Sequence, residues 1–226
     1  MLTLHYAPDN ASLIVRIVLH ELGLPFRTAL VDRATRQQDS AAFRALNPAG
    51  LIPVLETPQG PLAETAAILL WLAETQGRMA PPPGDPARGP FLQALFFLSN
   101  TLHADLRMIF YPRRYAPGAE AALHAAVTDR LRGHYALLEG WAGQGRLGGP
   151  QPSVLDIYTA VTLRWAALYA PGGAWFDPAP LPRLMAMAAQ LELRASVRAA
   201  ARAEGLGEAP FTRPRPCQPP EGSATG

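Results

Sequence analysis

The stretch NPAGLIPVL at residues 47–55 decides the fold that this sequence predicts. Its first four residues are typical of a turn, and Pro53 then begins a short apolar strand. Proline has no N–H to donate to a sheet, so a proline at the start of a strand suits a place where the backbone faces something other than a neighbouring strand. The Ile52-Pro53 bond is a candidate cis peptide, and such a bend would present the N–H and C=O of Ile52 to an extended, peptide-like ligand.

The stretch LAETAAI at residues 62–68 is the second informative segment, and a helix is expected to begin within it. Glu64 supplies a carboxylate and Thr65 a hydroxyl, while the first turn of a helix leaves backbone N–H groups without intrahelical partners. The carboxylate suits an ammonium group, and the N–H groups suit a ligand carboxylate. A ligand with a peptide middle and an amino-acid end fits both stretches.

Hydrophobic patterning around these stretches predicts an α/β domain of thioredoxin-like arrangement. The expected elements are a strand at 2–6, a helix at 12–22, a strand at 26–31, a short helix at 40–46, strands around 54–55 and 61–62, and a helix at 64–76. The first strand–helix–strand unit favours a parallel pair with a right-handed crossover. The order is therefore a βαβ unit followed by ββα.

The second half of the chain shows helical patterns and no convincing strand. Helices are expected near 90–111, 118–143, 153–169, 181–193 and 194–204. A Pro- and Gly-rich linker at 78–90 separates them from the first domain. The tail at 206–226 is rich in Pro, Gly and small polar residues, a composition typical of disorder.

Five motifs in this order resemble the cytosolic glutathione transferases, most of all the bacterial beta class. They are Tyr6-Ala7-Pro8 followed by Ser12-Leu13, the NPxGxxPxL run, Glu64-Thr65, Ser153-x-x-Asp156 and the LRWA sequence at 163–166. The resemblance covers residues 2–205. It implies an α/β thioredoxin-like N-terminal domain at 1–77 and an all-α C-terminal domain at 91–205. It also implies a homodimer, glutathione as co-substrate, no metal, and the transfer of glutathione to a hydrophobic small-molecule electrophile.

Composition excludes several other classes of protein. The 226 residues carry a net charge of +2, and all 20 basic residues are arginines scattered among acids, so no nucleic-acid-binding stripe is expected. The single cysteine, Cys217, cannot form an internal disulfide. No signal peptide is recognised, and no apolar run reaches the ~18 residues of a membrane span. A cytoplasmic protein with no membrane partner is expected.

The candidate catalytic group is the Ser12 hydroxyl at the start of the first helix. A free thiol has a pKa of about 8.5, and lowering this pKa by about two units takes about 2.7 kcal/mol. One hydrogen bond to the charged sulfur supplies about 1.5–3 kcal/mol, and a helix N-terminus about 0.3–1 kcal/mol. A hydrogen bond from the Ser12 hydroxyl is therefore sufficient to lower the pKa of the thiol by this amount. Serine at this position is also a common helix N-cap.

Ala11 departs from the beta-class pattern, which has Ala-Cys-Ser-Leu where this chain has Asn-Ala-Ser-Leu at 10–13. The departure argues against thiol–disulfide exchange and favours either a hydroxyl-dependent enzyme or one that has lost activity. Asn10 is an alternative donor to the sulfur. Tyr6 matches the catalytic tyrosine of the animal classes, but packing at a strand end explains it equally.

The resemblance assigns further residues to the substrates. Glu64 and Thr65 match the pair that holds the γ-glutamyl end of glutathione, with Ala11, Ile52 and Pro53 beside them. Arg36 matches a basic position near the glycyl carboxylate, or is a solvated loop residue. His103 matches a histidine near the sulfur, or is structural. The candidate acceptor pocket, which could equally be helix core, consists of Phe110, Tyr111, Trp165 and Tyr169.

Two alternatives to an enzyme stay open at this stage. A glutathione- or ligand-binding protein with little turnover would explain the missing cysteine. An interaction protein that has kept the fold would not need the Glu64-Thr65 pair. For the homodimer, the sequence offers Phe91, Leu95, Phe96 and Leu98, which exceed what one helix core needs.

Overall fold

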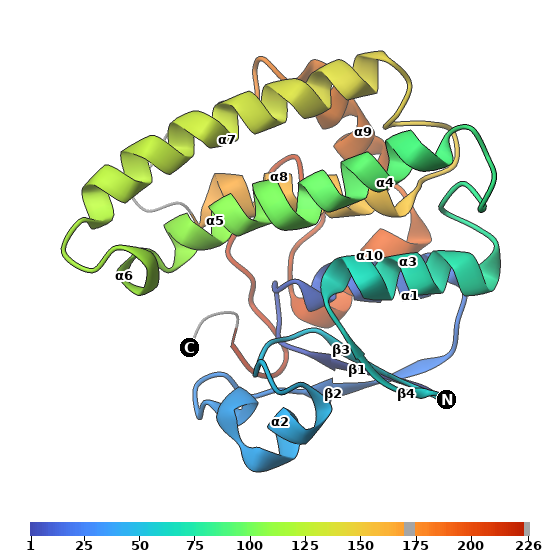
Figure 1. Cartoon of the computed structure of the whole chain (residues 1–226), viewed down its shortest axis with the longest axis vertical. Helices are drawn as coiled ribbons and strands as arrows, with labels where there is room; N and C mark the ends of the chain where they lie inside the picture. The colour runs from blue at the N-terminus through green and yellow to red at the C-terminus, as the bar shows by residue number, and fades with distance from the viewer. Residues whose placement is uncertain (170–174, 224–226) are drawn as a thin grey trace. The chain divides into compact units, whose positions relative to one another are not determined.

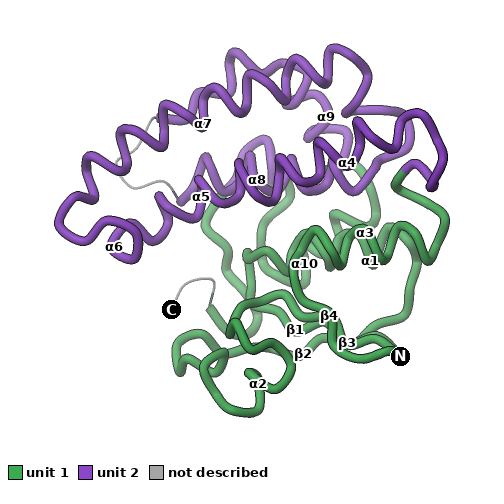
Figure 2. Tube along the Cα trace, in the orientation of Figure 1, with its two compact units in different colours: residues 1–80, 192–210, 215–226 green, residues 81–191, 211–214 purple. Residues whose placement is uncertain are grey.

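The structure, a computed structural model, describes residues 1–169 and 175–223. The chain forms two compact units, shown in different colours in Figure 2. Unit 1 comprises residues 1–80, 192–210 and 215–226, and unit 2 comprises residues 81–191 and 211–214. The helices and strands are labelled in Figure 1.

Unit 1 contains a four-stranded sheet in the order β2-β1-β3-β4. Its strands are β1 (Leu2–Tyr6), β2 (Phe26–Leu30), β3 (Val54–Thr57) and β4 (Gly60–Ala63). β1 is parallel to β2 and antiparallel to β3, and β3 is antiparallel to β4. The helix α1 (Ser12–Leu22) connects the parallel pair, so the predicted βαβ unit followed by ββα is confirmed.

The other helices of unit 1 are α2 (Ala41–Leu46), α3 (Thr65–Gln76) and α10 (Ala195–Glu204), with a 3-10 turn at Gln37–Asp39. The sequence placed α10 in the helical domain, but it packs against α1 of unit 1. Its buried stripe includes Val197 and Ala200. A second contact holds its start, because the Glu21 carboxylate accepts hydrogen bonds from Arg194 and, at 2.6 Å, from the Ser196 hydroxyl. The expected boundary at residue 205 therefore differs from the observed one.

Unit 2 is helical in every element that the structure describes there. Its elements are α4 (Arg88–Phe97), a π-helical segment (Leu98–Leu102), α5 (His103–Phe110), α6 (Pro112–Tyr115), α7 (Glu120–Gly143), α8 (Val154–Leu168) and α9 (Pro182–Glu192). Only the short α6 was absent from the prediction. A capping box between Ser153 and Asp156 begins α8, as the sequence motif indicated. Within the described residues no helix is long and apolar enough to cross a membrane.

The tail from residue 206 to 223 has defined contacts, whereas its composition suggested disorder. Leu206 and Phe211 are buried. The Gln218 N–H donates a hydrogen bond of 2.9 Å to the Gly205 carbonyl, and the Glu221 carboxylate accepts one from the Tyr6 hydroxyl. Composition did not reveal this order because the contacts are made by single residues spaced along an otherwise polar segment.

Gly205 is the position where a side chain would displace the tail. Its φ is +66°, and an added Cβ would lie 1.9 Å from the Gln218 carbonyl oxygen. Gly77 ends α3 with a similar φ of +62° but has nothing within 4 Å. Gly205→Ala and Gly77→Ala should each lower the free energy of unfolding by about 1–2 kcal/mol, because both positions have a left-handed backbone. We expect only Gly205→Ala to release the tail as well, measured as faster alkylation of Cys217 and faster hydrogen exchange over 206–223. Equal rates in both variants would contradict the prediction.

Candidate functional site

Strand register brings the predicted site segments to one edge of the unit 1 sheet. His5 pairs with Val54, and Val54 pairs with Ala63. The residues that follow β1, precede β3 and follow β4 therefore lie at the same edge. They are Pro53, Glu64 and the loop that follows Tyr6.

The Ile52-Pro53 bond is cis, as the sequence suggested. The Ile52 side chain packs against a small core that contains Val31, Phe43 and Val54. Its backbone N–H and C=O form no hydrogen bond with any residue that the structure describes. A donor and an acceptor are thus left for an extended ligand at the start of β3.

The start of α3 carries a strained acidic residue. Glu64 is the N-cap, its φ is 68° and ψ 115°, and its side chain is exposed and makes no capping hydrogen bond. A non-glycine residue at positive φ costs about 1–3 kcal/mol and is kept where the surrounding structure requires it. By contrast, α2 is capped by the Ser40 side chain and α8 by the Ser153 side chain. Thr65 follows in the first turn and is largely buried. The first N–H groups of α3 are therefore left for a ligand.

Ser12 is fully buried, and its hydroxyl is bonded across the loop before α1. It donates to the Ala7 carbonyl at 3.1 Å and accepts from the Ala7 N–H at 3.3 Å. Ser12 is not the N-cap of α1, which was the structural alternative to a catalytic role. Ala11 is the N-cap, and no side chain caps this helix. To donate a hydrogen bond to a sulfur atom, the Ser12 hydroxyl would have to break its hydrogen bond to the Ala7 carbonyl.

Asn10 and Ala11 lie beside this hydroxyl in the chain. The Asn10 side-chain oxygen accepts from the Ala11 N–H at 3.1 Å. Its amide nitrogen donates to no residue in the described part of the chain, so it is available to a ligand. Ala11 is buried, and its side chain is a methyl group where the resemblance predicts a cysteine.

Tyr6 is buried, and its hydroxyl is already bonded to the Glu221 carboxylate. The Arg16 guanidinium lies over its ring, 4.3 Å from the centroid. Burial raises the pKa of Tyr6 to about 12, and the hydrogen bond to Glu221 adds to this rise. The phenol is therefore neutral near pH 7 and its proton is engaged, which agrees with a packing role at the strand end.

Glu204, at the end of α10, is a site residue that sequence reasoning missed. It is fully buried. One of its oxygens accepts from the Asp9 N–H at 2.7 Å, and the other lies 2.8 Å from Arg16 Nε. This second contact is an ion pair without hydrogen-bond alignment. Burial raises the pKa of Glu204 to about 7, against the lowering effect of Arg16. An acid on the apolar stripe of α10, four residues after Ala200, was the available signal.

Arg36 lies in the loop after β2 and is 78% exposed. Its guanidinium donates to the Asp39 carboxylate at 2.8 Å, and Asp39 also binds Arg44. These hydrogen bonds, that of Arg36 first, hold the pKa of Asp39 below its ordinary value. A ligand carboxylate at Arg36 would compete with Asp39.

Unit 2 gathers most of the predicted acceptor residues into one aromatic cluster. The Phe110 ring lies 6.4 Å from Trp165 and 6.2 Å from Tyr169, centroid to centroid. His103 lies 5.1 Å from Trp165, and its Nδ1 is 2.8 Å from the Tyr158 hydroxyl. Burial lowers the pKa of His103 to about 4, so the imidazole is neutral at pH 7. Tyr111 instead contacts the guanidinium groups of Arg107 and Arg114.

Unit 1 thus contains a thioredoxin-like sheet with an unpaired backbone segment at one edge, and unit 2 contains an aromatic cluster among its helices. Two family models match the chain: the N-terminal domain of glutathione S-transferase over residues 11–75 and its C-terminal domain over residues 121–186. In the described part of the chain, no group of three His, Cys, Asp or Glu side chains is placed to hold a metal ion.

The chain is similar over most of its length to bacterial members of this family. Glutathione S-transferase GST-4.5 of Xanthomonas campestris is 33% identical over 211 residues, which is 90% of this chain and 98% of the relative. The structure of a sphingomonad glutathione S-transferase in complex with glutathione is 32% identical, with a TM-score of 0.73 over 91% of this chain and 100% of that one. A beta-class enzyme of Sphingomonas chungbukensis is 29% identical, with a TM-score of 0.74 over 90% of this chain and 98% of that one.

The chain belongs to the glutathione S-transferase family, and it is a glutathione transferase.

Glu64 gives the sharpest test of the binding edge. Glu64→Gly should relieve the positive φ and stabilise the fold by about 1 kcal/mol. The same change should weaken glutathione binding by about 1.5–3 kcal/mol, because a charge-assisted contact is lost. Glu64→Ala should weaken binding equally without the gain in stability, and Glu74→Ala, a change within the body of α3, is the control. Calorimetry and thermal unfolding measure the two effects, and unchanged affinity in both Glu64 variants would remove the assignment.

Proposed function

We propose that the enzyme binds glutathione along this edge of unit 1. The backbone of Ile52, next to Pro53, pairs with the peptide middle of the ligand. Glu64 takes the γ-glutamyl ammonium, and Thr65 with the first N–H groups of α3 takes its carboxylate. The observation that supports this most is the strained, exposed Glu64 at an uncapped helix, which lies at the same edge of the sheet as the unpaired Ile52 backbone.

The glycyl end of glutathione is assigned to Arg36. The support is its exposed guanidinium on the loop between β2 and α2. Asp39 neutralises it in the structure, so the gain from binding a carboxylate is the difference between two ion pairs. Exposed pairs contribute about 0.2–1 kcal/mol, and Arg36 therefore adds less to affinity than the α3 contacts do.

Thiol ionisation is assigned to Ser12. We propose that its hydroxyl keeps accepting from the Ala7 N–H while it turns its proton from the Ala7 carbonyl to the sulfur of glutathione. Three other groups are weaker donors. Asn10 has an unengaged amide but precedes the first residue of α1 by two positions, the Tyr6 proton is bonded to Glu221, and His103 is neutral.

Ser12→Ala should raise the pKa of the bound thiol by one to two units, about 1.4–2.7 kcal/mol, with little change in glutathione affinity. The rate at pH 7 should then fall about ten- to hundredfold and recover partly at alkaline pH, where the thiol ionises unaided. Ser12→Thr, which keeps the hydroxyl, is the matched control. Superimposable pH–rate profiles for Ser12→Ala and the unmodified enzyme would move the role to Asn10 or to the α1 N-terminus.

The acceptor is proposed to be a hydrophobic electrophile that contacts the aromatic cluster of Phe110, Trp165 and Tyr169. Phe110 and Tyr169 are partly exposed and offer apolar ring surface to a ring-containing substrate, whereas Trp165 is buried. The enzyme then acts by placing the thiolate against the acceptor and by stabilising its charge.

A glutathione-binding protein with little turnover is the second candidate. The bond between the Ser12 hydroxyl and the Ala7 carbonyl favours it, since the only hydroxyl at the start of α1 is engaged. The same assays separate the two candidates. Glutathione affinity with measurable conjugation of an aryl halide supports the enzyme, and affinity without conjugation supports the binding protein.

A homodimer is proposed from the family resemblance. Of the four apolar residues on α4 and its continuation, Phe91, Leu95 and Leu98 are buried within the chain itself, and only Phe96 is left, 51% exposed. Sedimentation at micromolar concentration should give twice the mass of the chain, and Phe96→Glu should shift the mass toward the monomer. A monomer before mutation would contradict the proposal.

A further inference from the structure

We propose that the acceptor substrate is an anion, a carboxylate carried on an apolar or aromatic body, and that Arg107 and Arg114 of unit 2 bind its charge. This inference rests on the proposed function, because it names the class of electrophile that the helical unit takes.

The first support is the arrangement of α5. Its Asp105, Leu106 and Ile109 are buried, and α5 packs against α7 and α8. His103, Arg107 and Phe110 follow at spacings of four and three residues, so they share the other, partly exposed face of the helix. One side of α5 thus presents the Arg107 guanidinium between His103 and Phe110.

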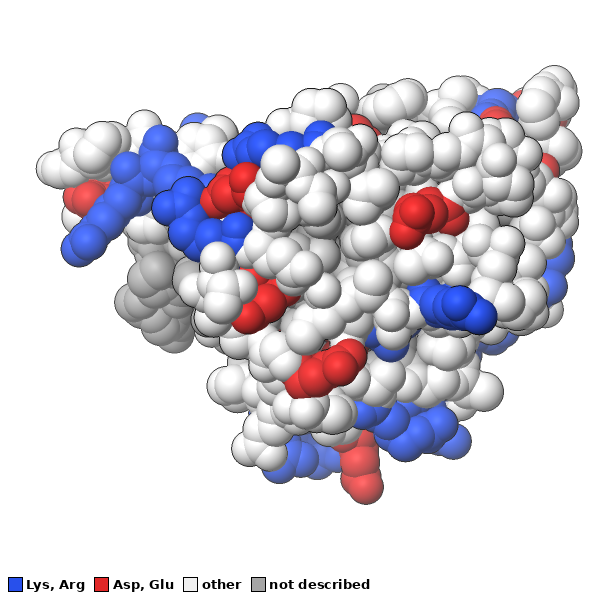
Figure 3. All heavy atoms as spheres, turned by 90° about the horizontal axis from the view of Figure 1, so that it is seen from below, with Lys and Arg blue, Asp and Glu red and all other residues white. Residues whose placement is uncertain are grey.

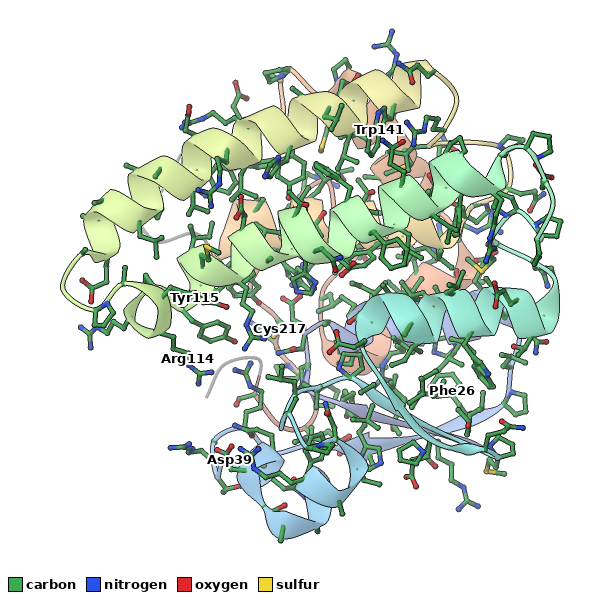
Figure 4. The ribbon with its side chains drawn as sticks, viewed as in Figure 1. Phe26, Asp39, Arg114, Tyr115, Trp141 and Cys217 are labelled. Atoms are coloured by element: carbon green, nitrogen blue, oxygen red, sulfur yellow. The ribbon has the colours of Figure 1, made fainter. Side chains whose placement is uncertain are left out.

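The second support is the convergence of two guanidinium groups on one ring. The Arg107 carbon Cζ lies 5.8 Å from the centroid of the Tyr111 ring, and that of Arg114 lies 5.1 Å from the same centroid. Arg107 also donates to the Tyr115 hydroxyl at 3.1 Å, which fixes its direction. Figure 4 shows Arg114 and Tyr115 projecting from α6 on the same side of that short helix.

The third support is that neither arginine has an acidic partner within the described residues. Two other arginines of the same region do: Arg130 lies 2.8 Å from Asp105, and Arg113 lies 3.9 Å from Glu120. Figure 3 shows several basic side chains on the left of the view, with acidic side chains among them. Like charges on one ring repel each other unless an anion joins them, and a guanidinium matches a carboxylate with two parallel N–H donors.

The aromatic cluster completes the site for such a ligand. Phe110 directly precedes Tyr111 in the chain and contacts Trp165 and Tyr169. A substrate with a ring on this cluster and a carboxylate on the two arginines uses both halves of the surface. A neutral acceptor would leave the two positive charges uncompensated.

The test compares 4-chloro-3,5-dinitrobenzoate with its methyl ester as acceptors for glutathione. In both reactions the sulfur forms a bond to the ring carbon, chloride leaves with the bonding electron pair, and the thiol proton passes to the buffer. We expect the unmodified enzyme to have at least a tenfold higher kcat/KM for the acid than for the ester. In the double variant Arg107→Met, Arg114→Met this ratio should fall about tenfold, equivalent to about 1.4 kcal/mol. The ratio should also fall with added salt.

Arg113→Met is the matched control, since Arg113 lies next to Arg114 but faces Glu120. It should leave the acid-to-ester ratio unchanged. The same ratio in the double variant as in the unmodified enzyme would overturn the proposal, and so would an enzyme that prefers the ester.

A direct binding measurement separates this proposal from the proposed function. If neither acceptor is turned over, conjugation by this protein fails, and calorimetry with 3,5-dinitrobenzoate, which has no leaving group, then decides the anion site. Binding that weakens about tenfold in the double variant but not in Arg113→Met supports it. No binding, or equal binding by all three proteins, overturns it.

Discussion

The buried carboxylate of Glu204 is the contact on which the binding edge of unit 1 depends. It reaches the Asp9 N–H across 195 residues of sequence and stands beside Arg16, which in turn lies over the Tyr6 ring. Removing Glu204 should cost about 3–5 kcal/mol, because the buried Arg16 guanidinium would stay without an acidic partner. The loop from Ala7 to Ser12 is therefore held from α10 as well as from the sheet. Residues from distant parts of the sequence therefore hold this loop together.

Elements with a strong period or a turn signal could be predicted from sequence, and single contacts between distant segments could not. The strand 2–6 and the helix 12–22 were predicted to the residue, because alternation and a terminal glycine define their ends. The place of α10 was predicted wrongly, since an amphipathic helix shows which of its faces is apolar but not which neighbour covers that face. The ordered tail was missed for a related reason.

The candidate site divides in the same way. The cis bond before Pro53 and the helix start at Glu64 and Thr65 were predicted correctly, because turns, strand starts and helix starts have recognisable sequence patterns. The hydrogen-bond direction of Ser12 leaves none: whether a serine before a helix caps it or bonds backwards to Ala7 is decided by loop geometry. The engagement of Tyr6 by Glu221 depends on the path of the tail. The backbone features of the candidate site could thus be predicted from sequence, whereas the hydrogen bonds of its individual side chains could not.

Charge gives a reason for two arginines on Tyr111. A thiolate that approaches an anionic acceptor meets electrostatic repulsion, which is stronger in a site of low dielectric constant than in water. A single arginine that pairs with the acceptor carboxylate neutralises its charge but leaves no net positive charge to attract the thiolate. A second guanidinium leaves a net positive charge on the ligand side after the carboxylate is bound. The pair of Arg107 and Arg114 would therefore bind an anionic acceptor and at the same time favour the approach of the second negative charge that the reaction requires.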